Sequence, residues 1–193
     1  FEERKLSDIK KLAGRGSKVM LTKSMHELAE LSGKIKKTND NIEKMTKDFI
    51  DYYSKNIFNE STLKKGLMDF LNWSKKNSIS MAVCTNKQEH LSIDLLKKIK
   101  IYDFFEYVAG GNTFNHNKPD PRHLTDTVEI LNGDIKKTLM IGDSETDANA
   151  SKAANIPFVL IKDGYTEKKT NEIYHDHLVN DFVNLEKIIQ KYL

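Results

Sequence analysis

Apolar residues recur every three or four positions through the first 60 residues, a spacing typical of amphipathic helices. The pattern predicts three helices, over residues 6–12, 23–31 and 39–56, separated by glycine-containing or polar segments. No strand-like apolar run interrupts them. We therefore expect residues 1–60 to form a small all-helical domain.

The pattern changes at residue 61, where short apolar runs begin to alternate with helical periodicity. Strands are predicted at residues 79–84, 107–109, 139–141, 157–161 and 178–179. Helices are predicted at residues 63–77, 91–99, 124–131, 145–155 and 185–193, with a helical turn at 101–105. This alternation is typical of a parallel sheet with right-handed crossovers. We expect an α/β fold in which residues 61–193 form a Rossmann-like parallel sheet.

Composition narrows the functional classes. The 193 residues are 38% hydrophobic and 31% charged, as in ordinary globular proteins. The net charge of +3 is spread over mixed acids and bases, which argues against a nucleic-acid surface. A single cysteine excludes an internal disulfide and fits a reducing compartment. No apolar run reaches membrane-spanning length, and the first residues do not resemble a signal peptide. We expect a cytoplasmic protein without a membrane partner.

Candidate chemistry begins where the apolar run 139–141 stops at Gly142 and Asp143. Ser144 is a suitable N-cap for the next helix, with Asp147 in its first turn. Open α/β sheets place ligands at the carboxyl ends of their strands, and two carboxylates suit Mg²⁺. The alternative is a plain strand-to-helix corner in which an aspartate only caps the helix.

Polar residues also follow two other predicted strands. Thr85 and Asn86 follow the first strand, and Lys118 follows the second and its loop. In a parallel sheet these positions meet Asp143 at one edge. A hydroxyl, an amide, an ammonium and a carboxylate together suit phosphoryl transfer. Taken singly, a Thr-Asn pair is more often a turn, and a lysine before proline usually faces solvent.

Three segments carry a family resemblance. Residues 83–87 (VCTNK), 118–121 (KPDP) and 141–147 (IGDSETD) resemble the second, third and fourth motifs of the haloacid dehalogenase (HAD) superfamily of phosphatases. The glycines at 110–111 and the segment 153–157 (AANIP) are similar to its phosphoglycolate phosphatase branch. The resemblance implies an HAD core at residues 61–193, and residues 1–60 then resemble the small helical cap of that family.

The resemblance also implies an activity and roles for individual residues. It implies a magnesium-dependent phosphomonoester hydrolase that acts on a small phosphorylated metabolite, such as 2-phosphoglycolate, through an aspartyl-phosphate. Thr85 and Lys118 would be catalytic. Thr85 would bind the transferring phosphoryl group with Asn86 beside it, and Lys118 would balance the charge. Asp143 would ligate Mg²⁺, with Asp147 ligating it or supporting it through water. No nucleic acid or membrane partner is implied.

The sequence departs from this family at its first motif, an apolar strand that ends in Asp-x-Asp and precedes the cap. No such stretch is present, and Asp8 and Asp51 lie in helical patterns. The first aspartate is the family's nucleophile and the second its general acid and base. Acid-base catalysis alone contributes roughly 10²–10⁴-fold, so we expect the 193 residues alone not to complete the reaction. Because that strand is central in the family's sheet, its absence should leave a gap in the core.

Three accounts fit this departure. The chain is a fragment of an intact phosphatase, which its non-methionine start at Phe1 and its preserved phosphate-site residues favour. Alternatively, it derives from a split or decayed gene and binds without catalysing, or another chain complements it. A dehalogenase of the same superfamily is disfavoured, because residues 118–119 and 142–144 match the phosphatase pattern better.

Four further residues invite a chemical interpretation. Cys84 ends a predicted buried strand without a phosphate-cradling loop, so we expect it in the core rather than as a nucleophile. His175 and His177 flank an aspartate but have no third ligand nearby, which favours a surface position. His116 lies in the loop before Lys118, and its role stays open.

Overall fold

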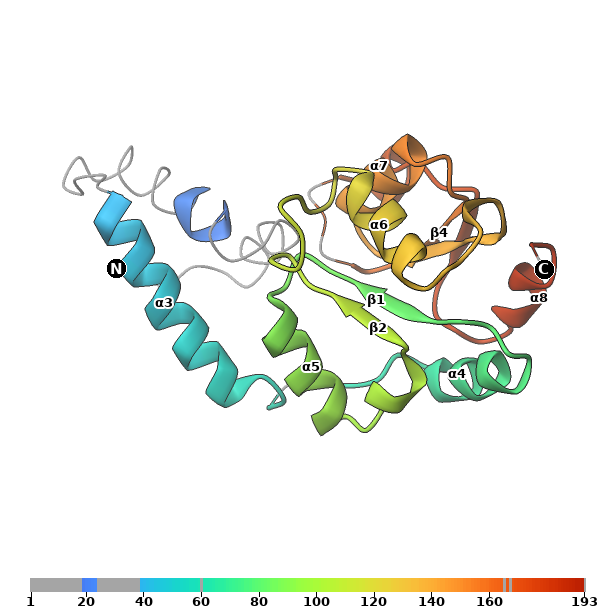
Figure 1. Ribbon diagram of the computed structural model, residues 1–193, viewed down its shortest axis with the longest axis horizontal. Coiled ribbons are helices and arrows are strands. Elements are labelled where there is room, and N and C mark those ends of the chain that lie inside the picture. The colour runs from blue at the N-terminus through green and yellow to red at the C-terminus, as the bar shows by residue number, and fades with distance from the viewer. Residues whose placement is uncertain (1–18, 24–38, 60, 165, 167, 193) are drawn as a thin grey trace.

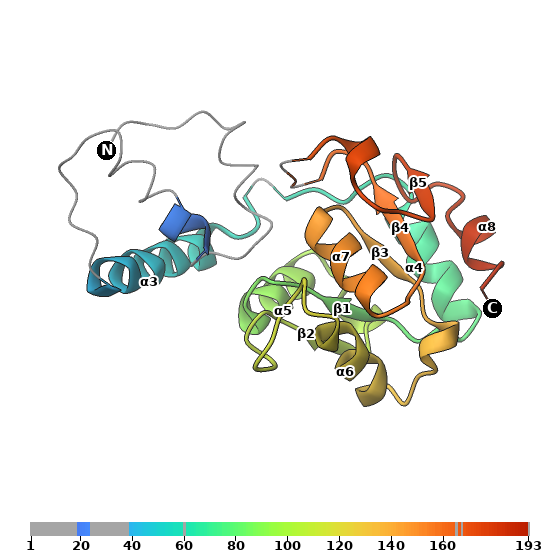
Figure 2. The same ribbon diagram turned by 90° about the horizontal axis from the view of Figure 1, so that it is seen from above.

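The computed structural model describes residues 19–23, 39–59, 61–164, 166 and 168–192. The predicted helix 6–12 and most of the predicted helix 23–31 lie outside these residues. Residues 19–23 are helical, although residues 19–22 lie between the predicted helices 6–12 and 23–31. Helix α3 spans Asn39–Asn56, as predicted, and lies to one side of the α/β body (Figures 1 and 2). The domain boundary near residue 60 stays a prediction.

Helices and short strands alternate from residue 67 onward. In chain order they are α4 Leu67–Lys76, β1 Ala82–Cys84, α5 Glu89–Lys98, β2 Tyr107–Ala109, α6 Arg122–Ile130, β3 Met140–Gly142, α7 Glu145–Ala153, β4 Phe158–Ile161, β5 His177–Val179 and α8 Glu186–Ile189. Strand β2 has the predicted bounds, whereas α8 is much shorter than the predicted helix 185–193. In the described part of the chain, no helix combines the length and apolar character needed to cross a membrane.

The strands pair in parallel but form two sheets rather than one. Strands β1 and β2 pair with Val83 opposite Val108. Strands β3, β4 and β5 form the second sheet, in that order, with Ile141 opposite Val159 and Leu160 opposite Leu178. Within the described residues no ladder joins β1 to β3. The single predicted sheet is therefore divided between β1 and β3, and the gap expected in a core without the family's first strand stays a prediction.

Burial differs sharply between the strands on either side of this division and the strand β4. All four residues of β4 are buried, because β4 has a paired strand on each side and helices on both faces. Every residue of β1 and β3 is only partly buried. Both runs are apolar enough for a fully covered strand, and each has an unpaired edge at the division between the sheets.

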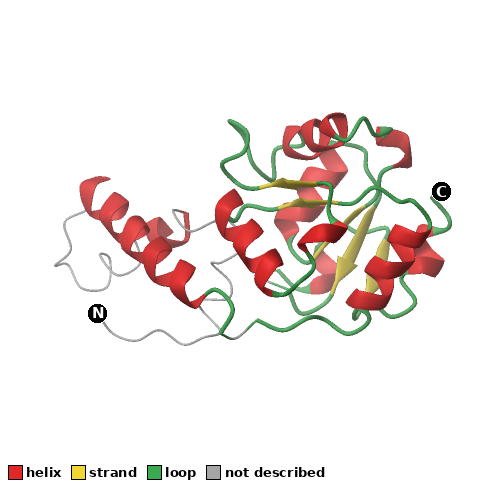
Figure 3. Ribbon diagram, turned by 60° about the horizontal axis from the view of Figure 1, so that its bottom comes forward, coloured by secondary structure: helices red, strands yellow, loops and turns green. Residues whose placement is uncertain are grey.

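Helices hold the two sheets together in a three-layer arrangement (Figure 3). On one face, α4 contributes Phe70 to the cluster over β4 and Leu71 to the cluster over β2. On the other face, Leu124 of α6 and Ala150 of α7 share a cluster, against which Cys84 of β1 and Met140 of β3 pack. The core therefore continues across the division through helices instead of strand pairing.

Candidate functional site

Lys118 is buried, 7% exposed, between the two sheets. Its Nζ donates to the carbonyl oxygen of Cys84 and to Oδ1 of Asp147, both at 2.5 Å. Thr85 follows Cys84 in the chain, and its N–H donates to the Ala109 carbonyl of β2. Since hydrogen bonds of a parallel strand alternate in direction, the Cys84 carbonyl points to the opposite edge of β1. Lys118 therefore links the open edge of β1 to the helix that follows β3.

Asp147 combines this ion pair with a helix cap. Ser144 is the N-cap of α7, as predicted, and its Oγ accepts a hydrogen bond from the Asp147 N–H at 3.3 Å. In return, Oδ2 of Asp147 accepts from the Asp143 and Ser144 N–H groups at 3.2 and 3.1 Å, and from the Ser144 hydroxyl at 2.7 Å. Both carboxylate oxygens are thus engaged, so the capping interpretation applies to Asp147.

The two buried charges stabilise each other. Burial opposes the charge of Lys118, but the attraction and hydrogen bond to Asp147, together with Cys84 and Asp143, outweigh it and raise the lysine pKa. Burial likewise favours the neutral form of Asp147, but the Lys118 ammonium and the Ser144 hydroxyl outweigh it and lower the carboxyl pKa. The pair is therefore ionised at neutral pH, and its ammonium and carboxylate are held at fixed positions.

Thr85 and Asn86 lie in the turn after β1. The Thr85 Oγ1 accepts a hydrogen bond from the Lys87 N–H at 3.1 Å, so the turn interpretation of this pair is also correct. The amide of Asn86 donates to the Lys118 carbonyl at 2.8 Å, which joins this turn to the lysine loop. A Cβ at Gly111 would lie 2.5 Å from the Asn86 carbonyl oxygen, so only glycine allows the two loops to approach this closely.

Asp143 follows β3 directly and is partly buried. A Cβ at Gly164, in the loop after β4, would lie 2.1 Å from the Asp143 carbonyl oxygen. A Cβ at Gly142 would lie 2.6 Å from that of Asp147, so this glycine leaves room for the folded-back carboxylate. The closely packed loops around Asp143 depend on both glycines.

The five predicted site residues are connected by successive contacts. Asn86 bonds to the Lys118 carbonyl, Lys118 pairs with Asp147, and Asp147 accepts from the Asp143 N–H, while Thr85 precedes Asn86 in the chain. Strand ends far apart in sequence therefore meet as predicted from the parallel topology. The chemical roles of these residues stay predictions.

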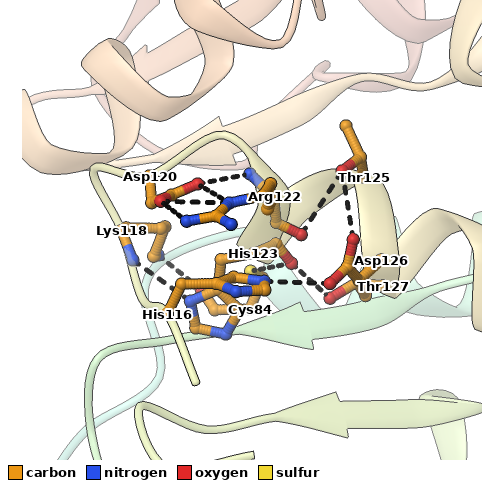
Figure 4. Close-up of polar contacts among 9 residues, drawn as sticks. All are labelled: Cys84, His116, Lys118, Asp120, Arg122, His123, Thr125, Asp126 and Thr127. Atoms are coloured by element: carbon orange, nitrogen blue, oxygen red, sulfur yellow. Dashed lines mark hydrogen bonds and ion pairs between the residues drawn. The ribbon is translucent and has the colours of Figure 1, made fainter. Parts of the chain in front are cut away.

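Two histidines lie in this neighbourhood, His116, which the sequence places before Lys118, and His123 (Figure 4). His123 is fully buried on α6, and its Nδ1 accepts a hydrogen bond from the Lys118 N–H at 3.1 Å. His116 pairs with Asp126 at 2.9 Å and stacks on Phe114. His123 could not be found from the sequence, because a single histidine in an amphipathic helix carries no spacing signal that distinguishes it from a surface residue.

The remaining candidates show no catalytic arrangement. Burial raises the pKa of the Cys84 thiol, which disfavours the thiolate, and its Sγ donates to the His123 carbonyl. His175 contacts the Ile173 carbonyl, and His177 contacts the Tyr192 hydroxyl. Among the residues that the structure describes, no three histidine, cysteine or acidic side chains are grouped as metal ligands.

Comparison with known proteins agrees with this arrangement. The family model of haloacid dehalogenase-like hydrolases matches residues 1–161. The chain belongs to the haloacid dehalogenase-like hydrolase family. The matched region includes all three of the segments on which the resemblance was based, and it also includes residues 1–60.

Relatives within this HAD family include two bacterial phosphoglycolate phosphatases. The protein from Mesorhizobium japonicum is 33% identical over 173 residues, which cover 90% of this chain and 74% of the relative. The protein from Agrobacterium fabrum is 32% identical over 193 residues, covering 95% and 79%. The similarity therefore extends over both the α/β body and the helical segment.

Solved HAD structures share the fold. A predicted phosphoglycolate phosphatase from Haemophilus somnus superposes with a TM-score of 0.89 at 24% identity, covering 96% of this chain and 83% of the other. A β-phosphoglucomutase from Clostridium difficile gives a TM-score of 0.76 at 20% identity, covering 96% and 81%. These matches confirm the predicted Rossmann-like α/β fold.

Proposed function

We propose that this HAD-family chain forms the phosphate- and magnesium-binding part of a cytoplasmic phosphomonoester hydrolase for a small phosphorylated metabolite. The observation that carries the proposal is the contact between the strand ends, in which Lys118 joins the turn after β1 to the α7 corner after β3. The named activity of the two relatives supports 2-phosphoglycolate or a close analogue as substrate.

Each site residue has a role that its chemistry allows. The Thr85 hydroxyl and the Asn86 amide can each donate a hydrogen bond to a phosphoryl oxygen. The Lys118 ammonium neutralises phosphate charge in a site with little water, where one fixed charge has a large effect. Because Lys118 already contacts Asp147, a bound phosphate shares this ammonium with a carboxylate.

The donor set fits Mg²⁺ through Asp143. Mg²⁺ commonly takes one or two protein carboxylates and completes its octahedron with water and substrate phosphate. The Asp143 carboxylate, at the carboxyl end of β3, provides one such ligand. Both oxygens of Asp147 accept hydrogen bonds from Lys118 or the helix cap, and its Oδ2 accepts from the Asp143 N–H. We therefore assign Asp143 as the ligand, because it directly follows the strand, and Asp147 as its support. When bound, Mg²⁺ neutralises charge on the phosphate and orients it.

Turnover requires a nucleophile beyond these residues. No two aspartates of the 193 residues are separated by one residue, so the Asp-x-Asp pair of the family has no counterpart here. We propose that an apolar strand ending in a carboxylate, placed between β1 and β3, supplies the nucleophile. The partial burial of both strands supports this position. The nucleophilic carboxylate would attack the phosphorus and form the aspartyl-phosphate as the ester O–P bond breaks, and the substrate's alcohol would leave with a proton from the second aspartate of the pair. Water would then hydrolyse the aspartyl-phosphate to inorganic phosphate and the free carboxylate.

The second candidate function is binding of phosphate or Mg²⁺ without catalysis. It is favoured by the same missing Asp-x-Asp pair and by the engagement of Lys118 with Asp147, which stabilises the site without a nucleophile. In this case the chain acts as a sensor or interaction protein on an HAD fold.

One experiment separates the two functions. Phosphate release from a panel of phosphometabolites that includes 2-phosphoglycolate is measured with and without Mg²⁺. The 193-residue chain is compared with the same chain preceded by an apolar strand ending in Asp-x-Asp-Gly-Thr. We expect magnesium-dependent release only with the added strand, and none when its first Asp is replaced by Asn.

Release by the 193 residues alone would contradict the requirement for the strand. Phosphate binding without release in either form would support the non-catalytic function. A Thr85→Val variant of the extended chain serves as a matched control, because it keeps the side-chain volume and removes the hydroxyl. It should reduce release while leaving Mg²⁺ binding unchanged.

A further inference from the structure

His123 has no part in the roles described above, although it is fully buried directly beside the site (Figure 4). It stands in the first turn of α6, five residues after Lys118, and touches three parts of the fold. Its ring meets Phe114 edge to face, with the ring centroids 5.6 Å apart. Its carbonyl accepts hydrogen bonds from the Cys84 thiol and from the Thr127 hydroxyl.

The ring nitrogen Nδ1 makes the contact that matters for the site. It accepts a hydrogen bond from the main-chain N–H of Lys118 at 3.1 Å. Accepting this bond requires a lone pair on Nδ1, so the imidazole is neutral with its proton on Nε2. Protonation of Nδ1 would replace the acceptor by a donor facing another donor, and the bond would be lost.

The surroundings keep this ring neutral. Burial has the largest effect, followed by the nearby charges of Lys118 and His116, and together they lower the pKa of His123 to about 4. The Ala109 backbone and the Asp126 carboxylate act in the opposite direction but are weaker. At neutral pH the acceptor at Nδ1 is therefore permanently available.

Both main-chain groups of Lys118 are hydrogen-bonded to side chains. The Asn86 amide holds its carbonyl at 2.8 Å, and His123 holds its N–H. With both main-chain groups held, the side chain extends to the Cys84 carbonyl and to Asp147. A shift of the Lys118 backbone would move the ammonium away from these two acceptors.

We infer that His123 is a positioning residue for Lys118: its neutral Nδ1 holds the Lys118 main chain and thereby sets where the ammonium meets a bound anion. The consequence for phosphate binding rests on the proposed function. The placement of the ammonium between Cys84 and Asp147 is independent of that function, so the two statements are tested by different signals.

Two variants separate this role from simple packing. His123→Asn keeps an acceptor oxygen near the position of Nδ1 but loses the ring. His123→Phe keeps a buried ring against Phe114 but loses the acceptor. If His123 positions Lys118, the Asn variant retains the wild-type site and the Phe variant loses it. If His123 only packs, the order is reversed.

The first readout is the ¹H–¹⁵N signal of the Lys118 ammonium in the full chain, assigned by its loss in Lys118→Arg. A buried, doubly hydrogen-bonded ammonium exchanges slowly with water and gives such a signal. We expect the signal to persist in His123→Asn and to shift or disappear in His123→Phe. An unchanged signal in His123→Phe would overturn the inference.

The second readout is the affinity for inorganic phosphate, measured by calorimetry. Since an N–H left without its acceptor costs the free energy of a hydrogen bond, we expect about tenfold weaker binding in His123→Phe and less than about threefold in His123→Asn. If the wild-type chain binds no phosphate, the proposed function fails, and the ammonium signal still decides the role of His123.

If a variant does not fold, an acid titration of the wild-type chain tests the same contact without a substitution. The Lys118 amide and ammonium signals should move together with the His123 ring signal as it takes up a proton near pH 4. Protonation of His123 without any change at Lys118 would overturn the inference.

Discussion

Strands β1 and β4 show how the same kind of apolar run reaches different degrees of burial. Both are short, apolar and parallel to their neighbours, yet β4 is buried at all four residues and β1 is only partly buried. Strand β4 lies between β3 and β5, whereas β1 pairs with β2 alone and has an unpaired edge at the division. The number of paired neighbours is not sufficient by itself, since β2 also has one and two of its three residues are buried. Burial of a strand therefore depends on what covers its edges and faces and not on the run itself.

The division between the two sheets also explains why a charged pair lies inside this molecule. Lys118 and Asp147 are 7% and 8% exposed in their side chains, and they connect the end of β1 to the helix after β3. Where strand pairing does not join the sheets, this ion pair and the helices α4, α6 and α7 do.

Lys118→Met should cause the largest loss of stability, because it leaves the Asp147 carboxylate buried without its counter-charge. Removing one partner of a buried ion pair costs about 3–5 kcal/mol. Urea unfolding of the variant and of the wild-type chain measures the difference. Lys118→Met/Asp147→Asn is the matched control and should recover part of the loss. A cost below about 1 kcal/mol would show that the pair does not hold the sheets together.

Lowering the pH should reduce the free energy of unfolding first on the β1–β2 side, where His123 lies. The folded-state pKa of about 4 is below the ordinary value of 6.5, so the unfolded chain binds the proton first as the pH falls. Stability is therefore full above pH 6.5 and decreases by about 3 kcal/mol as the pH falls to about 4.

Unfolding free energies at several pH values measure this decrease, and His123→Asn should flatten it. Asp147 contributes to stability down to a lower pH than His123 does. Because its pKa is lowered in the folded state, its contribution to stability is lost only as the pH falls below about 4. Amide exchange should show faster opening of β1 and β2 than of β4 across the first window. Equal opening of the two sheets would contradict the comparison.

A pair of valine truncations compares the sheets directly. Val159→Ala in β4 removes two fully buried methyl groups and should cost about 1.5–3 kcal/mol. Val83→Ala in β1 makes the same change in a partly exposed strand, so we expect about half that cost. Denaturant unfolding measures both variants. Equal losses would indicate that β1 is as well covered as β4.

Ser144→Ala should have the smallest effect. It removes the N-cap of α7 and one of the hydrogen bonds to Asp147, at a cost of about 1 kcal/mol. Ser144→Thr keeps the hydroxyl and should behave like the wild-type chain in thermal unfolding. If the threonine variant loses as much as the alanine variant, the cap does not account for the effect.

Local features of this protein could be predicted from its sequence. The periodicity of residues 39–56 predicted α3 with its correct bounds, because helical spacing is a property of neighbouring positions. Ser144 and Asp147 predicted the start of α7, since both partners of a capping box lie within one turn. The order of strands and helices likewise predicted that Thr85, Lys118 and Asp143 meet at one edge of a parallel arrangement.

Only the tertiary structure decided the contacts between distant residues. The division of the sheet between β1 and β3 depends on which strands pair, and no single run records its partner. Lys118 lies 34 residues from Cys84 and 29 from Asp147 in the sequence. Its burial and its ion pair could not be predicted locally, because a lysine before proline usually faces solvent. His123 acquires its neutral state from a buried site that three separate segments create. Charge, burial and pKa are set by the whole neighbourhood, which forms only when the chain folds.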